Sequence, residues 1–147
     1  MGLFRRRSEP PRVQPAGGPL DGPLGDLALF ALTHAVRSVV PEGGPLIPFA
    51  MVETTDGRAL ARFVGDLEEA QARARDHVRA SSAVRAAVAW DGYLTVEGVR
   101  TDALFVEAGE PGTAGIVLAH RYRDAGAGPA EAIGRPILVD PARPPLL

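Results

Sequence analysis

The sequence predicts an α+β fold in which a helix-hairpin-helix segment (helix, β-hairpin, helix) precedes an antiparallel β-meander. We expect a single sheet with the helices packed on it. Two stretches repeat apolar residues at the helical period, and several others alternate or run apolar as strands do. Asp-Gly dipeptides, which favour tight turns, separate some of these strands. No parallel βαβ series is present, which argues against a dinucleotide-binding fold and a TIM barrel.

The first helix is expected to begin at Leu24 and to end before Pro41. Its apolar residues follow the i, i+3, i+4, i+7 rule throughout. Asp26 and Arg37 lie on the opposite side with other polar residues, and these polar groups exclude a membrane span.

A β-hairpin is predicted after this helix. Residues 46–52 form a nearly continuous apolar run, and residues 58–64 return as the second strand. Asp56-Gly57 between them accepts the positive φ of a two-residue turn. Pro48 has no N–H donor, so the first strand lies at an edge or has Pro48 near its start.

Asp66 is predicted to cap the second helix, because its carboxylate can accept from the N–H of Glu69. Acidic residues come early in this helix and arginines come late, which complements the helix dipole. The apolar stripe consists mostly of small side chains, so the helix should lie close against the sheet.

The meander is expected to begin with residues 84–90, which alternate between two faces. Asp91-Gly92 is predicted to form a second two-residue turn, with strands over 93–97 and 100–108 after it. Further strands are expected over residues 116–123 and, as a short edge strand, over 136–139. The prolines from residue 141 onward should stop regular structure.

The length of 147 residues predicts one domain with two tails. Residues 1–23 are expected to be a disordered arm rich in Pro, Gly and Arg. Residues 24–140 form a single α+β domain, and residues 141–147 are a Pro-rich C-terminal tail. A composition with 46% apolar and 23% charged residues excludes the membrane, collagen-like and wholly disordered classes.

The amino-acid usage indicates a cytoplasmic bacterial protein. Cysteine is absent, which excludes disulfides, thiol nucleophiles and cysteine-bound zinc. All 16 basic residues are arginine, lysine and asparagine do not occur, and Ala, Gly and Pro are abundant, as a GC-rich genome produces. Polar residues and prolines follow the arginine run at residues 5–7, so no export signal is expected.

No cofactor or metal ion is expected. The three histidines, His34, His77 and His120, are dispersed over the first helix, the second helix and a late strand. They lack the HxH or HExxH spacing of metal sites. No GxSxG elbow surrounds a serine, and the glycine-rich residues 109–115 lack the GK[ST] of a phosphate loop. We therefore expect a protein without catalytic activity.

A small hydrolase or transferase with an acid/base site around His120 is the alternative. Neighbouring strands of a meander can bring Asp102, Glu107, His120 and Tyr122 together. Asp102 and Glu107 are five residues apart and face opposite sides of an unbroken strand, so either of them can meet His120, but both can do so only if a bulge intervenes. A polar cluster at the sheet edge accounts for the same residues without chemistry.

Trp90 and Tyr93 are the candidate binding residues. They flank the predicted Asp91-Gly92 turn, where their rings should stack across the hairpin. An exposed tryptophan beside a hairpin tip would also serve as a binding anchor.

The arm carries a positive charge, whereas the rest of the chain is acidic. Arg5, Arg6 and Arg7 follow Leu3 and Phe4, and this run predicts weak contact with an anionic surface. The acidic body does not resemble a nucleic-acid-binding domain, so nucleic acid is not expected as a partner.

Residues 45–49, 90–96, 100–103 and 106–108 carry the pattern IPF…DGY…DA…VEA. This pattern resembles a group of small uncharacterised bacterial proteins and extends over most of residues 45–123. The resemblance implies no assigned activity. The order of helix, hairpin, helix and meander is also similar to the roadblock/longin type of scaffold, which implies dimers and partner binding.

These observations predict a cytoplasmic accessory or protein-interaction domain without catalytic activity. An exposed sheet edge or helix face would bind a second copy of the chain, giving a homodimer, or another protein.

Overall fold

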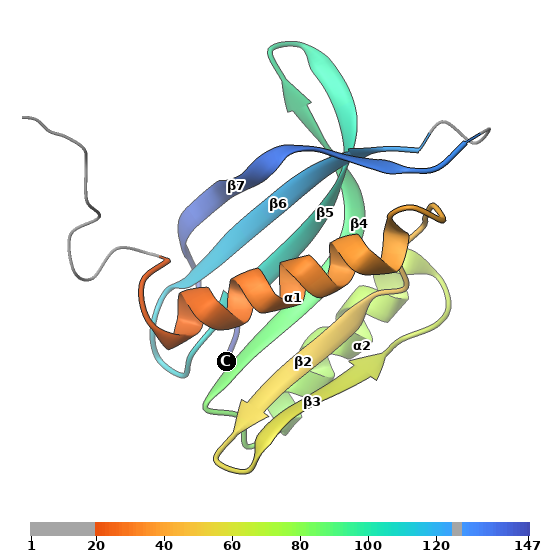
Figure 1. Cartoon of the computed structure of the whole chain (residues 1–147). Helices are drawn as coiled ribbons and strands as arrows, with labels where there is room; N and C mark the ends of the chain where they lie inside the picture. Colours follow the sequence, from red (N-terminus) through yellow and green to blue (C-terminus); the bar gives the residue numbers. More distant parts are fainter. Residues whose placement is uncertain (1–19, 125–127) are drawn as a thin grey trace, which may run out of the picture.

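The computed structural model describes residues 20–124 and 128–147, and it has the α+β fold shown in Figure 1. The elements are α1 (Pro23–Val39), β2 (Phe49–Thr54), β3 (Gly57–Arg62), α2 (Leu67–Ala80), β4 (Arg85–Val96), β5 (Val99–Gly109), β6 (Gly115–Arg123) and β7 (Glu131–Arg143). The strands form a six-stranded sheet in the order β3-β2-β4-β5-β6-β7, and all neighbours are antiparallel. The predicted α+β class and antiparallel sheet are confirmed. The predicted arm lies, up to residue 19, outside the described residues.

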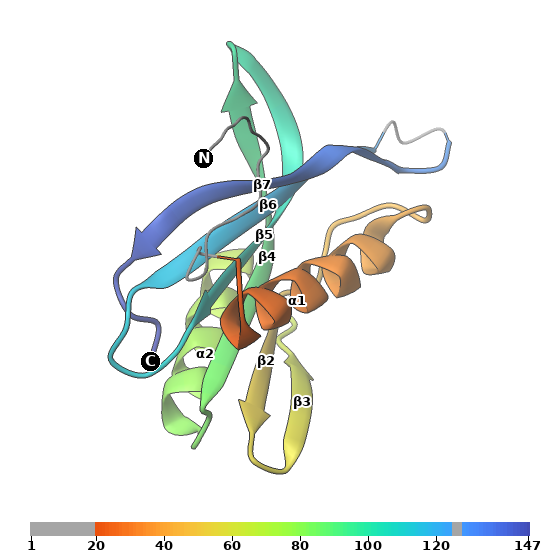
Figure 2. The same cartoon turned by 60° about the vertical axis from the view of Figure 1, so that its left-hand side comes forward.

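The two helices are separated by β2 and β3 and cover opposite faces of the sheet (Figures 1 and 2). Successive residues of a strand point to opposite faces, so β2 and β4 contribute alternate side chains to two cores. The core beneath α1 includes Leu27, Leu32, Phe49, Leu104 and Leu118. The core beneath α2 includes Ala50, Ala74, Val78 and Val88. Neither described helix is long and apolar enough to span a membrane.

Helix α1 begins one residue before the predicted start, with Pro23 in its first turn, where a missing N–H costs nothing. Its predicted apolar face is buried against β4, β5 and β6. The helix ends at Val39, before Pro41, as predicted.

The predicted hairpin is present as β2 and β3, but its turn lies one residue earlier than expected. Thr54 pairs with Gly57, so the two turn residues are Thr55 and Asp56. Gly57 has a φ of 133° and is the first residue of β3 rather than the second residue of the turn.

The predicted cap of α2 is confirmed. The Asp66 carboxylate accepts a hydrogen bond from the Glu69 N–H at 3.4 Å. Ala70, Ala74 and Val78 are fully buried against β2 and β4, and the two alanines allow the close approach that their size predicts.

The predicted turn at Asp91-Gly92 is wrong, because β4 runs through both residues without interruption. The chain reverses instead at Glu97 and Gly98, whose φ values of 50° and 79° both lie in the left-handed region. A two-residue hairpin turn of type I′ requires positive φ at both of its central residues. Gly92 has another role, since a Cβ there would lie 3.1 Å from the Phe105 ring.

The C-terminal strand is much longer than predicted. Regular structure was expected only over residues 136–139, whereas β7 extends to Arg143. Pro136 and Pro141 lie within shifts of the β6–β7 register, where a missing N–H breaks no regular ladder bond. Leu146 beyond the strand is buried against Gly109, so this part of the predicted tail is packed on the α2 face.

Candidate functional site

A groove lies at the end of the sheet where β4 loses its pairing with β2. The last pair of these strands is Phe49 with Ala89, and beyond it the segment of residues 45–48 takes the place of β2. Two adjoining cavities, of about 360 and 450 Å³, form the groove. They share Pro45, Leu67 and Asp91 as lining residues, so the two halves meet at the Asp91 carboxylate.

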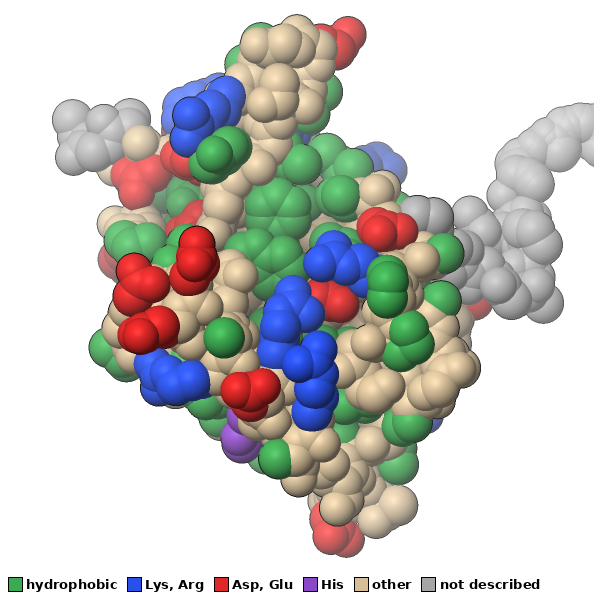
Figure 3. Space-filling model, turned by 180° about the vertical axis from the view of Figure 1, so that it is seen from behind, with side chains coloured by type: hydrophobic (Ala, Val, Ile, Leu, Met, Phe, Trp, Pro, Cys, Tyr) green, Lys and Arg blue, Asp and Glu red, His purple; other side chains and the backbone are tan. Residues whose placement is uncertain are grey.

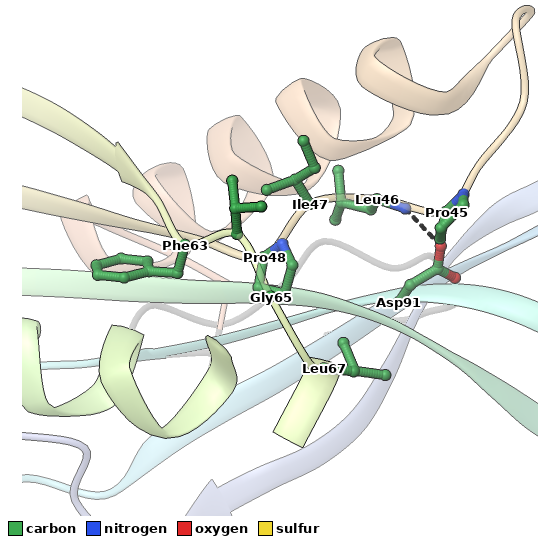
Figure 4. Close-up of a pocket in the computed structure, with 9 residues that line it drawn as sticks. Pro45, Leu46, Ile47, Pro48, Phe63, Gly65, Leu67 and Asp91 are labelled. Atoms are coloured by element: carbon green, nitrogen blue, oxygen red, sulfur yellow. Dashed lines mark hydrogen bonds between the residues drawn. The ribbon is translucent and has the colours of Figure 1, made fainter. Parts of the chain in front are cut away.

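One half of the groove is apolar. Residues 45–48 form one wall, and the segment from Phe63 to Leu67, which connects β3 to α2, forms the other. Figure 4 shows Ile47 and Leu67 on opposite sides of this cavity, with Asp91 at its end. Ile47, Val64 and Leu67 are 46%, 73% and 45% exposed. A cluster of three exposed large apolar side chains at one cavity is unusual, because exposed apolar residues normally occur singly on a protein surface.

The other half of the groove is acidic. Asp91 from β4, Asp102 from β5 and Asp124 after β6 line it, together with the rings of Tyr93 and Tyr122. The antiparallel register produces this gathering, because Tyr93 pairs with Asp102 and Tyr122 lies on the same face of the sheet.

Asp91 is held at the junction by two hydrogen-bond donors. Its carboxylate accepts from the Leu46 N–H at 2.7 Å, and the single Tyr122 hydroxyl hydrogen is shared between its two oxygens, at 2.8 and 3.0 Å. Burial raises the pKa of Asp91, the nearby Asp102 adds to this, and the hydrogen bonds from Leu46 and Tyr122 oppose it. Burial and the bond to Asp91 raise the pKa of Tyr122 well above its usual range.

The loop after α1 is tied to the acidic half through a glycine. The Gly44 N–H donates to the Asp124 carboxylate at 3.0 Å. The preceding Gly43 has a φ of 106°, and a Cβ there would lie only 2.9 Å from an Asp124 carboxylate oxygen. A side chain at residue 43 would therefore strain the backbone and displace the Asp124 carboxylate.

The groove combines an apolar cavity with carboxylates that have internal partners. The described part of the chain contains no group of three or more His, Cys, Asp or Glu placed to hold a metal ion. The Asp91 oxygens are already occupied by internal donors. The arrangement suits a ligand that carries an apolar group beside a positive charge.

The structure does not bring His120, Glu107 and Asp102 into one site. The Nε2 atom of His120 lies 3.1 Å from the carbonyl oxygen of Gly134, on the α1 face of the sheet. Glu107 lies on the α2 face, where it forms an ion pair with Arg75 at 2.6 Å. Asp102 shares the face of His120, but no ion pair within the described residues joins them.

Trp90 and Tyr93 are not opposite each other, because the predicted turn between them does not exist. Trp90 pairs with Phe105 on the α2 face, and their rings stack at a centroid distance of 5.5 Å. The Arg75 guanidinium lies 5.6 Å from the Trp90 ring. Figure 3 shows this face from behind, with hydrophobic surface beside a group of arginines. Exposed Tyr93 instead lines the acidic half of the groove.

Sequence reasoning missed Asp91 because an Asp-Gly dipeptide is a strong turn signal. The pattern around these two residues favoured a strand over a turn. Asp and Gly are both disfavoured in strands, so their occurrence inside an otherwise continuous strand pattern marks a special position.

No family model, curated protein or solved structure matches this chain.

Proposed function

We propose that this chain is a protein-interaction domain without catalytic activity, and that its groove binds a partner segment in which an apolar side chain stands beside a basic one. The observation that carries this proposal is the junction of an apolar and an acidic cavity at Asp91. From the amino-acid usage, we place this function in the bacterial cytoplasm.

The apolar half supplies the affinity in this proposal. Ile47, Val64 and Leu67 are exposed at the cavity, and covering them removes apolar surface from water. The walls are anchored to each other, because the Phe63 N–H donates to the Pro48 carbonyl oxygen at 2.9 Å. A pre-formed cavity lowers the entropy cost of binding.

The acidic half selects the charge of the partner. Asp102 is exposed, and its charge adds to the effect of burial, which is the main cause of the raised pKa of Asp91 and of Tyr122. A bound cation would offset this repulsion between like charges. An acidic partner segment would add to the repulsion, so the groove discriminates by charge.

The sheet edges support the groove as the binding site. The outer strand β3 has only six residues and carries Arg58 and Arg62. The other edge strand, β7, contains Pro136 and Pro141. Short strands, charges and prolines are the features by which natural sheets avoid pairing at an edge. Self-association through an edge remains a prediction that light scattering can test.

A peptide-binding measurement tests the proposal. We expect a fluorescein-labelled pentapeptide, Leu-Ile-Arg-Arg-Arg, to bind in fluorescence anisotropy and the matched Leu-Ile-Glu-Glu-Glu peptide to bind at least 10-fold more weakly. Asp102→Asn should weaken binding of the arginine peptide about 5-fold, since it removes one nearby charge. Asp76→Asn, the same change on the exposed face of α2, should have no effect.

The apolar half is tested by a second pair of variants. Val64→Ala should weaken binding of the arginine peptide, whereas Val139→Ala on β7 should not. Equal affinity of the two peptides, or equal effects of the groove and control variants, would overturn the proposal.

The enzyme alternative makes an opposite prediction about His120. In our proposal, His120→Ala leaves peptide binding unchanged, because the histidine contacts a backbone carbonyl oxygen and not the peptide. It also causes no loss of ester turnover. Turnover of an activated ester that is lost in His120→Ala would favour the hydrolase instead.

A further inference from the structure

We infer that the groove is occupied by the chain's own residues 3–7, so that these residues compete with a partner segment for the same site. This inference rests on the proposed function. Leu3 and Phe4 are followed directly by Arg5, Arg6 and Arg7, which is the apolar and basic composition that the groove suits. Residues 3–7 lie outside the described residues.

The connecting chain is long enough to reach the groove. Leu20 is the first described residue and lies at the start of α1, whereas Gly44 and Pro45, which line the groove, follow the end of α1 (Figure 2). The 17 residues of α1 span roughly 25 Å. Residues 8–19 can extend over about 40 Å, which exceeds this distance.

The charges of the two segments are complementary. Three consecutive arginines would face Asp102 and Asp124 in the acidic half, while Leu3 or Phe4 would enter the cavity beside Ile47 and Leu67. The two halves share Asp91, so apolar and basic side chains that are neighbours in sequence can occupy both at once.

Attachment to the same chain makes a weak contact effective. Two segments of one chain meet at an effective concentration of about 1 mM when the residues between them can span the distance. A contact with a dissociation constant of about 0.1 mM would then be formed roughly 90% of the time. A free partner segment binds only the unoccupied fraction, so its apparent affinity falls about 10-fold.

Charge reversal in the full chain tests this competition. We expect the triple variant Arg5→Glu, Arg6→Glu and Arg7→Glu to bind the labelled Leu-Ile-Arg-Arg-Arg peptide about 10-fold more tightly than the unmodified chain. The matched control reverses three arginines outside the proposed contact, Arg12→Glu, Arg79→Glu and Arg135→Glu, and should bind like the unmodified chain.

The outcomes separate this inference from the proposed function. If the peptide binds both the unmodified chain and the residue 5–7 variant with equal affinity, the inference is wrong and the proposed function stands. If the peptide binds neither protein, the proposed function fails, and the inference fails with it.

A spin label locates the contact directly. The chain contains no cysteine, so Ser8→Cys provides a single labelling site. We expect the label to broaden the amide NMR signals of Gly65 and Asp102, and not that of Ser82 beyond the far end of α2. The same broadening at 50 and 500 µM protein supports contact within one chain. Broadening that grows with concentration, or none at Gly65 and Asp102, would overturn the inference.

Discussion

The Tyr122 hydroxyl donates a hydrogen bond to the Asp91 carboxylate at 2.8 Å and thereby connects β6 to β4 across β5. Both side chains are buried, and the same carboxylate holds the Leu46 N–H of the segment that forms a groove wall. This network therefore fixes the junction of the two halves of the groove as well as the end of the sheet.

We predict that Asp91→Ala lowers the free energy of unfolding by about 2 kcal/mol, because it leaves the buried Leu46 N–H and Tyr122 hydroxyl without an acceptor. Asp91→Asn keeps one acceptor oxygen and should lower the stability by less. Urea denaturation measures both, with Asp76→Ala as a control on the surface of α2. Equal losses for the alanine and asparagine variants would mean that the hydrogen bonds do not matter.

The raised pKa of Asp91 predicts how stability depends on pH. The folded protein holds this proton more tightly than the unfolded chain, whose carboxyl titrates near the ordinary value of 3.8. The stability that this adds is fully present below pH 3.8 and is lost as the pH rises through the folded pKa. Asp91→Asn removes the titration.

The free energy of unfolding of the unmodified chain should therefore fall relative to that of Asp91→Asn as the pH rises from 3.5 to 7. Urea denaturation of both proteins across this range measures the difference. A difference that moves in the opposite direction would show that the pKa of Asp91 is lowered in the folded state.

The ion pair between Arg75 and Glu107 predicts a large effect on the α2 face. The Glu107 side chain is only 3% exposed, so Arg75→Ala leaves a nearly buried carboxylate without its closest cation. We expect a loss of about 3 kcal/mol, at the low end for such changes, because Arg143 lies 3.8 Å from the same carboxylate.

Thermal or urea denaturation of Arg75→Ala checks this prediction, with Arg79→Ala on the same helix as its control. Adding Glu107→Gln to Arg75→Ala should restore part of the stability, because the buried charge is then removed. No recovery in the double variant would assign the loss to the packing of Arg75 against Trp90.

The cap of α2 gives a smaller effect. Asp66→Ala removes the acceptor of the Glu69 N–H and should lower the free energy of unfolding by about 1 kcal/mol. The denaturation midpoint measures this change, and Asp66→Asn, which retains an acceptor, should lose much less. An unchanged midpoint for Asp66→Ala would show that water replaces the cap without cost.

The elements that could be predicted from the amino-acid sequence are those whose signals are local. The period of the apolar residues in α1 and the Asp66 cap of α2 depend on residues within a few positions of each other. The α+β class, the antiparallel sheet and the hairpin of β2 and β3 follow from such signals. Asp102, Tyr93 and Tyr122 line the groove, but the sequence placed them in two other sites, around His120 and at a turn beside Trp90.

The role of Asp91-Gly92, the length of β7 and the grouping of the site residues depend on contacts between distant parts of the chain. An Asp-Gly dipeptide satisfies its local preference in a turn. Here the Asp91 carboxylate instead accepts hydrogen bonds from donors in two distant segments, and Gly92 leaves room for the Phe105 ring. Those partners lie 45 and 31 residues away from Asp91. The competition between turn and strand is therefore settled by burial and hydrogen bonding across the sheet, which no local pattern encodes.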